Sequence, residues 1–141
     1  MSTVRYPLQL GDIARADFRT SLPADHENSR FQREWGFAFR YQPARLAISV
    51  SLSDPTPPST HIEAYGKPIK GDTLFGQDES DLAAWVALIV EHSGEDDLSR
   101  REFQDLVAQH WARGLDMLER KLNKVEDGIV GVVENLLATH P

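Results

Sequence analysis

The stretch WGFAFRYQPARLAISVSL, residues 35–52, carries the strongest local pattern in the sequence. Large apolar residues alternate with small or polar ones on both sides of a short connection, residues 42–45. Alternation with a period of two is typical of half-buried strands, and a four-residue connection is ordinary for a hairpin. The stretch therefore predicts a β-hairpin with its large apolar side chains on one face. These residues are Trp35, Phe37, Phe39, Tyr41, Leu46, Ile48, Val50 and Leu52.

The aromatic half of this hairpin has a second interpretation. Exposed aromatic side chains can stack on the bases of single-stranded nucleic acid, and Arg33, Arg40 and Arg45 flank the stripe. The aliphatic residues of the second strand favour burial instead, because burying a large apolar side chain contributes roughly 1.5–3 kcal/mol. We therefore expect the aromatic stripe to form core.

Two more strands are expected beside the hairpin. Residues 4–10 alternate, and Pro7 lacks a backbone donor, so this strand should lie at a sheet edge. Residues 61–65 form the third candidate strand. A short helix capped by Asp12 and a polar loop over residues 22–29 complete the first half of the chain.

The second half of the chain has helical patterns. Asp78 or Ser80 can cap a helix that ends at Gly94, and its apolar residues 82–90 predict a central helix packed on more than one side. Ser99 and Glu102 form a capping box for the next helix.

That last helix carries apolar residues at heptad spacing: Leu115, Leu118, Leu122, Val125, Ile129, Val132 and Leu136. Two interpretations stay open. The helix could break near residues 127–128 and fold back onto the sheet, or the seam could join two copies in a homodimer.

These elements together predict an α+β fold. We expect a small antiparallel sheet of three to four strands with two to three helices packed on one face. The helices should lie mainly in the C-terminal half. One domain spans residues 1–141, with strands and loops mainly in 1–66 and helices in 78–138.

Charge is distributed unevenly along the chain. The net charge is −7, and the acidic excess falls in the second half, mostly between residues 72 and 105. A net negative charge argues against direct nucleic-acid binding, which needs a basic surface. An acidic region can attract a basic protein partner, and the residues expected to do so are Asp78, Glu79, Asp81, Glu91, Glu95, Asp96, Asp97 and Glu102.

Residues able to perform chemistry are sparse. The sequence has no cysteine and no catalytic or phosphate-binding motif, so we expect no metal and no cofactor. His110 lies within an apolar helical arc and is expected to be a core residue. His61, Glu63 and Tyr65 would share one strand face, either as an ordinary solvated surface or as part of a pocket.

The functional hypotheses follow from this shortage of catalytic groups. The leading one is a non-enzymatic inhibitor or immunity-type protein whose acidic surface masks a basic partner. The alternatives are a dimeric escort or secretion-type chaperone, and a small hydrolase or ligand-binding domain with a pocket between sheet and helices. The longest apolar run is shorter than the ~20 residues of a membrane span, so a cytoplasmic location is expected.

Overall fold

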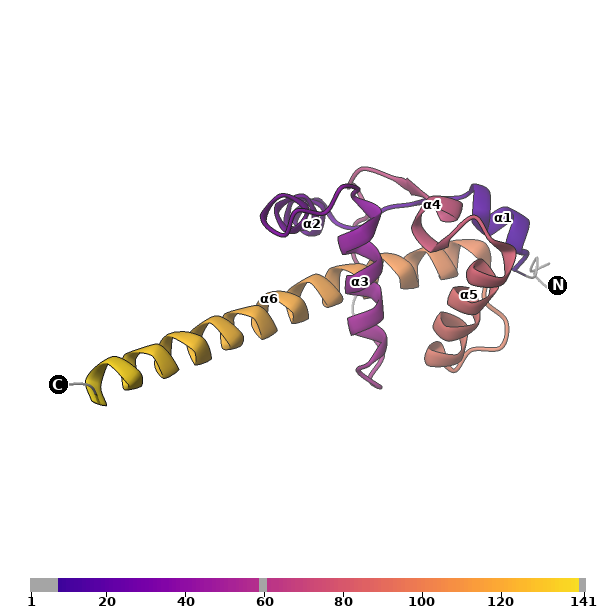
Figure 1. Cartoon of the computed structure of the whole chain (residues 1–141). Helices are drawn as coiled ribbons and strands as arrows, with labels where there is room; N and C mark the ends of the chain where they lie inside the picture. The colour runs from indigo at the N-terminus through magenta and orange to yellow at the C-terminus, as the bar shows by residue number, and fades with distance from the viewer. Residues whose placement is uncertain (1–7, 59–60, 140–141) are drawn as a thin grey trace.

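The fold is mainly helical in a computed structural model that describes residues 8–58 and 61–139 (Figure 1). Beyond Lys124, only the side chain of Leu136 is described. The elements are α1 (Leu10–Arg15), β1 (Asp17–Phe18), α2 (Leu22–Glu34), α3 (Tyr41–Leu52), β2 (Ile69–Lys70), α4 (Gly71–Phe75), α5 (Glu79–Ser93) and α6 (Arg100–Thr139).

The predicted α+β fold is therefore wrong. The sheet found in the described residues is one antiparallel pair, in which Asp17 lies opposite Lys70 and Phe18 opposite Ile69. Helices are not confined to the C-terminal half either, because α2 and α3 lie before residue 53. The expected three- to four-stranded sheet with helices on one face does not form.

The predicted hairpin over residues 35–52 is replaced by a turn and a helix. Trp35 caps the C-terminal end of α2, and Gly36 follows with a φ of 71°, a left-handed conformation that glycine adopts without strain. The chain then enters α3 at Tyr41. Pro43 lies in the first turn of α3, where a missing N–H removes no helical hydrogen bond.

Small residues explain why residues 41–52 form a helix. The buried residues of α3 are Pro43, Ala44, Ala47, Ile48 and Ser51, a set that repeats with the helical period. The alternation that suggested a strand involves only the large apolar residues, and one of them, Leu46, is exposed. The stripe that decides the packing consists mainly of small side chains.

This small stripe lets α3 and α6 cross at very short range. A Cβ atom built on Gly114 of α6 would lie 1.7 Å from the carbonyl oxygen of Ala47. No other residue type fits between the two backbones at this crossing. The contact between α3 and α6 is the most extensive between any two of the described elements.

Other expectations for the first half also change. Residues 22–29 lie within α2 rather than in a loop, with Ser21 as the N-cap and Pro23 in the first turn. Residues 61–65 form no strand. The strand expected over residues 4–10 lies mostly outside the described residues, and α1 begins at Leu10.

The helical predictions for the second half are confirmed. Asp78 caps α5 by accepting a hydrogen bond from the Ser80 N–H, and Gly94 ends it with a φ of 70°. Ser99 and Glu102 form the reciprocal capping box of α6. One of the two open interpretations is wrong, because α6 does not break near residues 127–128 but continues to Thr139 and extends beyond the other helices (Figure 1).

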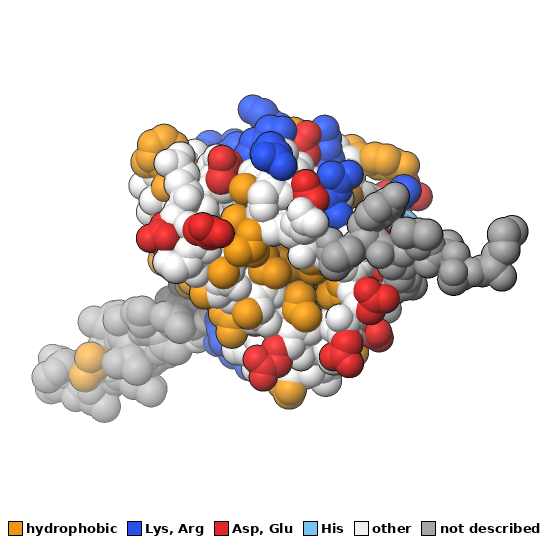
Figure 2. Space-filling model, turned by 90° about the vertical axis from the view of Figure 1, so that its right-hand side faces the viewer, with side chains coloured by type: hydrophobic (Ala, Val, Ile, Leu, Met, Phe, Trp, Pro, Cys, Tyr) orange, Lys and Arg blue, Asp and Glu red, His pale blue; other side chains and the backbone are white. Residues whose placement is uncertain are grey.

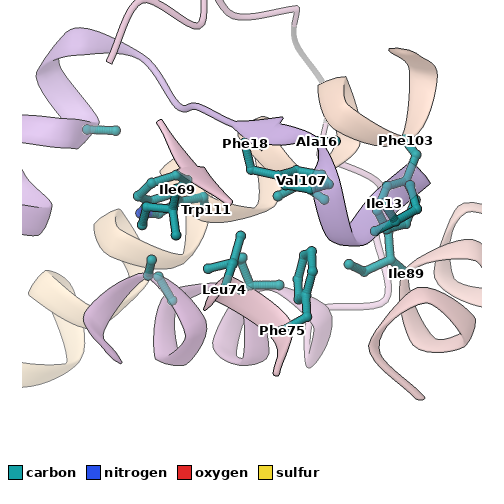
Figure 3. Close-up of a cluster of buried hydrophobic side chains, with 14 of the residues drawn as sticks. Ile13, Ala16, Phe18, Ile69, Leu74, Phe75, Ile89, Phe103, Val107 and Trp111 are labelled. Carbon is teal, nitrogen blue, oxygen red and sulfur yellow. The ribbon is translucent and has the colours of Figure 1, made fainter. Parts of the chain in front are cut away.

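The core lies between the first part of α6 and the short elements α1, β1 and α4. Figure 3 shows Phe18, Phe75 and Phe103 among its labelled side chains, and these three rings contact one another at centroid separations of 5.3–6.4 Å. Trp111 is fully buried, and its indole N–H donates to Asn28 Oδ1 at 3.0 Å. This polar contact connects α6 to α2.

No helix among the described residues is long and apolar enough to cross a membrane.

Candidate functional site

A groove of about 460 Å³ lies where the end of α2, the turn before α3, β2 and α4 meet. We call it the Phe39 groove. Its lining residues are Gln32, Ala38, Phe39, Arg40, Tyr41, Pro68, Ile69, Lys70 and Thr73. The groove therefore combines aromatic side chains with cationic ones.

The aromatic part of this groove is a stacked pair. The rings of Phe39 and Tyr41 lie 5.7 Å apart and nearly parallel, at 11°. The Arg45 guanidinium lies 4.8 Å from the centre of the Tyr41 ring and also donates to the carbonyls of Thr73 and Leu74. Phe39 remains 57% exposed, so a large aromatic surface at the groove faces solvent.

Arg40 is held in place by several contacts at once. Its guanidinium forms an ion pair with Asp25 at 2.6 Å and donates to the carbonyl of Lys67 at 3.2 Å. The carbonyl of Arg40 accepts from the buried Asn28 amide at 3.0 Å. These bonds fix the turn that presents Phe39.

Two lysines lie on the opposite side of the groove. Lys70 of β2 lines it and forms an ion pair with Asp17 at 2.8 Å, a hydrogen bond that lowers the pKa of the Asp17 carboxyl. Lys67 precedes β2, is exposed, and its backbone N–H donates to Asp25. The Lys70 ammonium also donates to the carbonyl of Arg15 at 3.3 Å.

The acidic residues predicted to bind a partner do not form one continuous surface. Asp78, Glu79 and Asp81 lie at the start of α5, whereas Glu91 and residues 95–97 lie at its other end. A 15-residue helix spans roughly 22 Å, so the two groups are well separated. Glu102 binds the Ser99 N–H in the capping box.

A second groove, of about 370 Å³, lies along α5 and includes two of the acidic residues that follow this helix. We call it the α5 groove; its lining residues are Leu8, Ala83, Val86, Ala87, Val90, Asp96, Asp97 and Leu98. Figure 2 views the side of the molecule on which α1 and α5 lie. It shows a band of hydrophobic side chains, with Lys and Arg gathered above it and most acidic side chains beside and below it.

The expectation that His110 is a core residue is confirmed. His110 is fully buried, and its Nδ1 lies 2.8 Å from Ser51 Oγ. Arg113 Nε donates to the same oxygen at 2.7 Å, so the Ser51 hydroxyl connects His110 to Arg113. Burial, followed by the charges of His92 and Arg113, lowers the pKa of His110 to about 4.

The other polar residues lie at the surface, where a hydrogen bond to Glu63 raises the pKa of Tyr65. His61, Glu63 and Tyr65 lie in an extended segment without strand pairing, and each is exposed. No group of three or more His, Asp or Glu residues able to hold a metal ion occurs among the described residues. These positions do not assemble into a site with His110.

Sequence reasoning missed the two lysines and misplaced the aromatic residues. Lys67 and Lys70 are close together in the sequence, and the first 70 residues have a net positive charge. This local excess of positive charge was the feature of the sequence that could have indicated a cationic surface. The overall charge of −7 concealed it, because the acidic residues lie elsewhere on the surface.

A comparison with curated proteins finds no match to this chain. A comparison with protein families matches residues 17–126 to the family described as DNA sulphur modification protein DndE. This match covers most of the chain, including both sides of the Phe39 groove, and it overturns the hypotheses of an inhibitor or immunity protein and of a chaperone. The chain belongs to the DNA sulphur modification protein DndE family.

Proposed function

We propose that the chain is a DNA-contacting component of a DNA sulphur modification system and binds DNA through the Phe39 groove. The observation that carries this proposal is the exposed Phe39 ring stacked on Tyr41, with Arg40 and Lys70 in the same groove. Aromatic rings beside cations bind single-stranded nucleic acid by stacking on bases and contacting phosphates. The family match suggests DNA as the ligand, and the residues of the groove suggest binding by stacking and phosphate contacts.

The cationic residues give this surface a charge different from that of the whole chain. Arg40, Arg45, Lys67 and Lys70 lie in or beside the groove, and the ion pairs of Asp25 and Asp17 are made with Arg40 and Lys70. These four cations therefore outnumber the two carboxylates that pair with them. A phosphate responds to the local potential and not to the net charge of the protein. A chain with a net charge of −7 can therefore bind DNA at this surface.

The proposed role is binding and not catalysis. The lining residues of the Phe39 groove include no histidine, aspartate or glutamate, and the sequence has no cysteine. Nucleophilic or acid–base chemistry requires a nucleophile close to a base, and the groove lining lacks that pair. We infer that the chain holds DNA while other proteins of the system perform the chemistry. This role agrees with the cytoplasmic location expected from the sequence.

Stacking on Phe39 would distinguish single-stranded DNA from duplex DNA. A base inside a duplex has both faces covered by its neighbours, so only an unstacked base can lie on this ring. We expect single-stranded DNA, or a duplex with a gap or nick, to bind more tightly than intact duplex of the same length.

Fluorescence anisotropy with labelled oligonucleotides tests the proposal. Phe39→Ala should weaken binding of single-stranded DNA by about 1–3 kcal/mol, the range measured for one stacking residue. Tyr65→Ala is the matched control, since Tyr65 is an exposed aromatic residue, at 68%, that does not line the groove. Equal affinities for the wild type and Phe39→Ala would refute the proposed binding mode.

The heptad seam that would join two copies is described only in part, because the side chains of Val125, Ile129 and Val132 lie outside the described residues. Leu115 is buried in the core of its own chain, and Leu118 and Leu122 line a small apolar depression together with Trp35 and Leu46. Trp35 and Leu46 are largely exposed there. We propose that self-association, if the system uses it, occurs through this depression. Sedimentation at increasing concentration tests it, and Leu46→Glu should dissociate any dimer formed.

A further inference from the structure

Helix α5 has two apolar faces, and among the described residues the second is covered only in part, because Val86 and Val90 are half-buried against the core while also lining a groove. Leu82 and Ile89 face the core and are the buried residues of α5. A second apolar stripe consists of Ala83, Val86, Ala87 and Val90, spaced as neighbours on one helical face. The sequence predicted a helix packed on more than one side, and within the described residues the second side lines an open groove.

The α5 groove has the features of a binding site for a helix. Leu8 and Leu98 extend the stripe sideways, so the apolar floor is wider than one helix face. Asp96 and Asp97 line one end of this floor. An amphipathic helix lays its own apolar stripe into such a groove, with anchors at the same spacing.

We propose that the α5 groove binds a basic amphipathic helix of a partner protein in the DNA sulphur modification system. The charges select this occupant, because Asp96 and Asp97 favour Lys or Arg at the edge of the apolar contact and repel phosphates. The basic protein partner expected from the sequence would thus bind at the α5 groove, and the part of it that binds would be a helix. DNA bound at the Phe39 groove and a helix bound here would occupy different surfaces, since the two linings share no residue.

A synthetic peptide serves as the probe. The peptide has about 14 residues, enough for a stable helix on binding, with leucines at helical spacing and lysines at the remaining positions. A peptide with glutamates in place of the lysines is its control. Titration of the full-length ¹⁵N-labelled chain should give NMR shift changes at Leu8 and in residues 83–98 with the lysine peptide only.

Two matched pairs of variants test the contacts. Ala87→Glu places a charge in the groove and should weaken lysine-peptide binding more than about tenfold, whereas Ala84→Glu makes the same change outside the lining. Asp96→Lys should weaken binding several-fold at low salt, whereas Glu95→Lys reverses an exposed charge of the same loop without lining the groove. Ala84, Ala87, Glu95 and Asp96 are exposed, so these variants should fold.

The outcomes separate the alternatives. Shift changes confined to the groove and lost in Ala87→Glu but kept in Ala84→Glu support the proposal. Equal binding of both peptides, or of both members of a pair, would overturn it. Sedimentation that shows the wild type self-associating and Ala87→Glu dissociating would also overturn it, because a second copy would then occupy the groove. Unchanged oligonucleotide binding by Ala87→Glu keeps this test independent of the Phe39 groove.

Discussion

Replacing Gly114 with alanine places a methyl group where α3 and α6 cross. The new Cβ would lie 1.7 Å from the carbonyl oxygen of Ala47 and 2.3 Å from its carbonyl carbon. Real Cβ contacts are essentially never shorter than 3.0 Å, so the Ala47 oxygen must retreat by more than 1 Å. Both partners are backbone atoms of helices, and neither can rotate away. The helices must separate along the most extensive contact in the fold.

This separation sets the expected magnitude. Overpacking a close contact costs about 1–3 kcal/mol and occasionally more, while alanine in a helix gains about 1 kcal/mol over glycine. Because the clash is with backbone, we expect the upper part of this range, a loss of at least about 2 kcal/mol in the free energy of unfolding. The melting temperature should fall by roughly 5–10 °C.

Urea denaturation followed by circular dichroism measures this change, with Gly11→Ala as the control. Gly11 also lies within a helix, but its nearest contact is the end of the flexible Arg15 side chain at 3.6 Å. We expect Gly11→Ala to be neutral or to gain up to about 1 kcal/mol. If Gly114→Ala were equally neutral, the close crossing of α3 and α6 would be wrong.

Three further predictions concern protonation, a buried hydrogen bond and DNA binding. Because the pKa of His110 is lowered from 6.5 to about 4 in the folded chain, unfolding takes up a proton between these values. Stability should therefore fall by about 3 kcal/mol from pH 6.5 to pH 4, and His110→Gln should remove most of this fall in pH-dependent urea melts. Asn28→Ala leaves the Trp111 N–H and the Arg40 carbonyl without their partner, so thermal melts should show a loss of about 2–4 kcal/mol. Lys70→Ala should reduce the salt slope of single-strand binding by about 0.7, whereas an unchanged slope would exclude a phosphate contact.

The second half of the chain could be predicted because its signals are local. The cap at Asp78, the left-handed Gly94 and the capping box at Ser99 each depend on residues within a few positions. Such signals do not require knowledge of what packs against the helix. The end of α6 was harder to predict from the sequence, because glycines near its end lower helix propensity without preventing a helix.

The first half was mispredicted because tertiary packing determines it. Leu46, Ile48, Val50 and Leu52 alternate as in a strand, yet the residues that matter are Ala44, Ala47 and Ser51, which fit against α6. A small side chain carries weak hydrophobic signal, and only the position of Gly114 shows its importance. The same error assigned the aromatic stripe to the core. The candidate site could not be predicted for the same reason, since Lys67 and Lys70 approach Phe39 only in the folded chain.

Mapping a bound oligonucleotide by NMR tests the central claim most directly. Titration of the ¹⁵N-labelled chain with short single-stranded DNA should shift the amide signals of Phe39, Tyr41 and Lys70, which line the Phe39 groove, and of Lys67, whose carbonyl binds the lining residue Arg40. A second cationic surface provides the contrast, because Arg120, Lys121 and Lys124 are exposed on α6. Shift changes around the groove and none on α6 are the predicted result. Changes confined to α6, with the groove signals unmoved, would contradict the account.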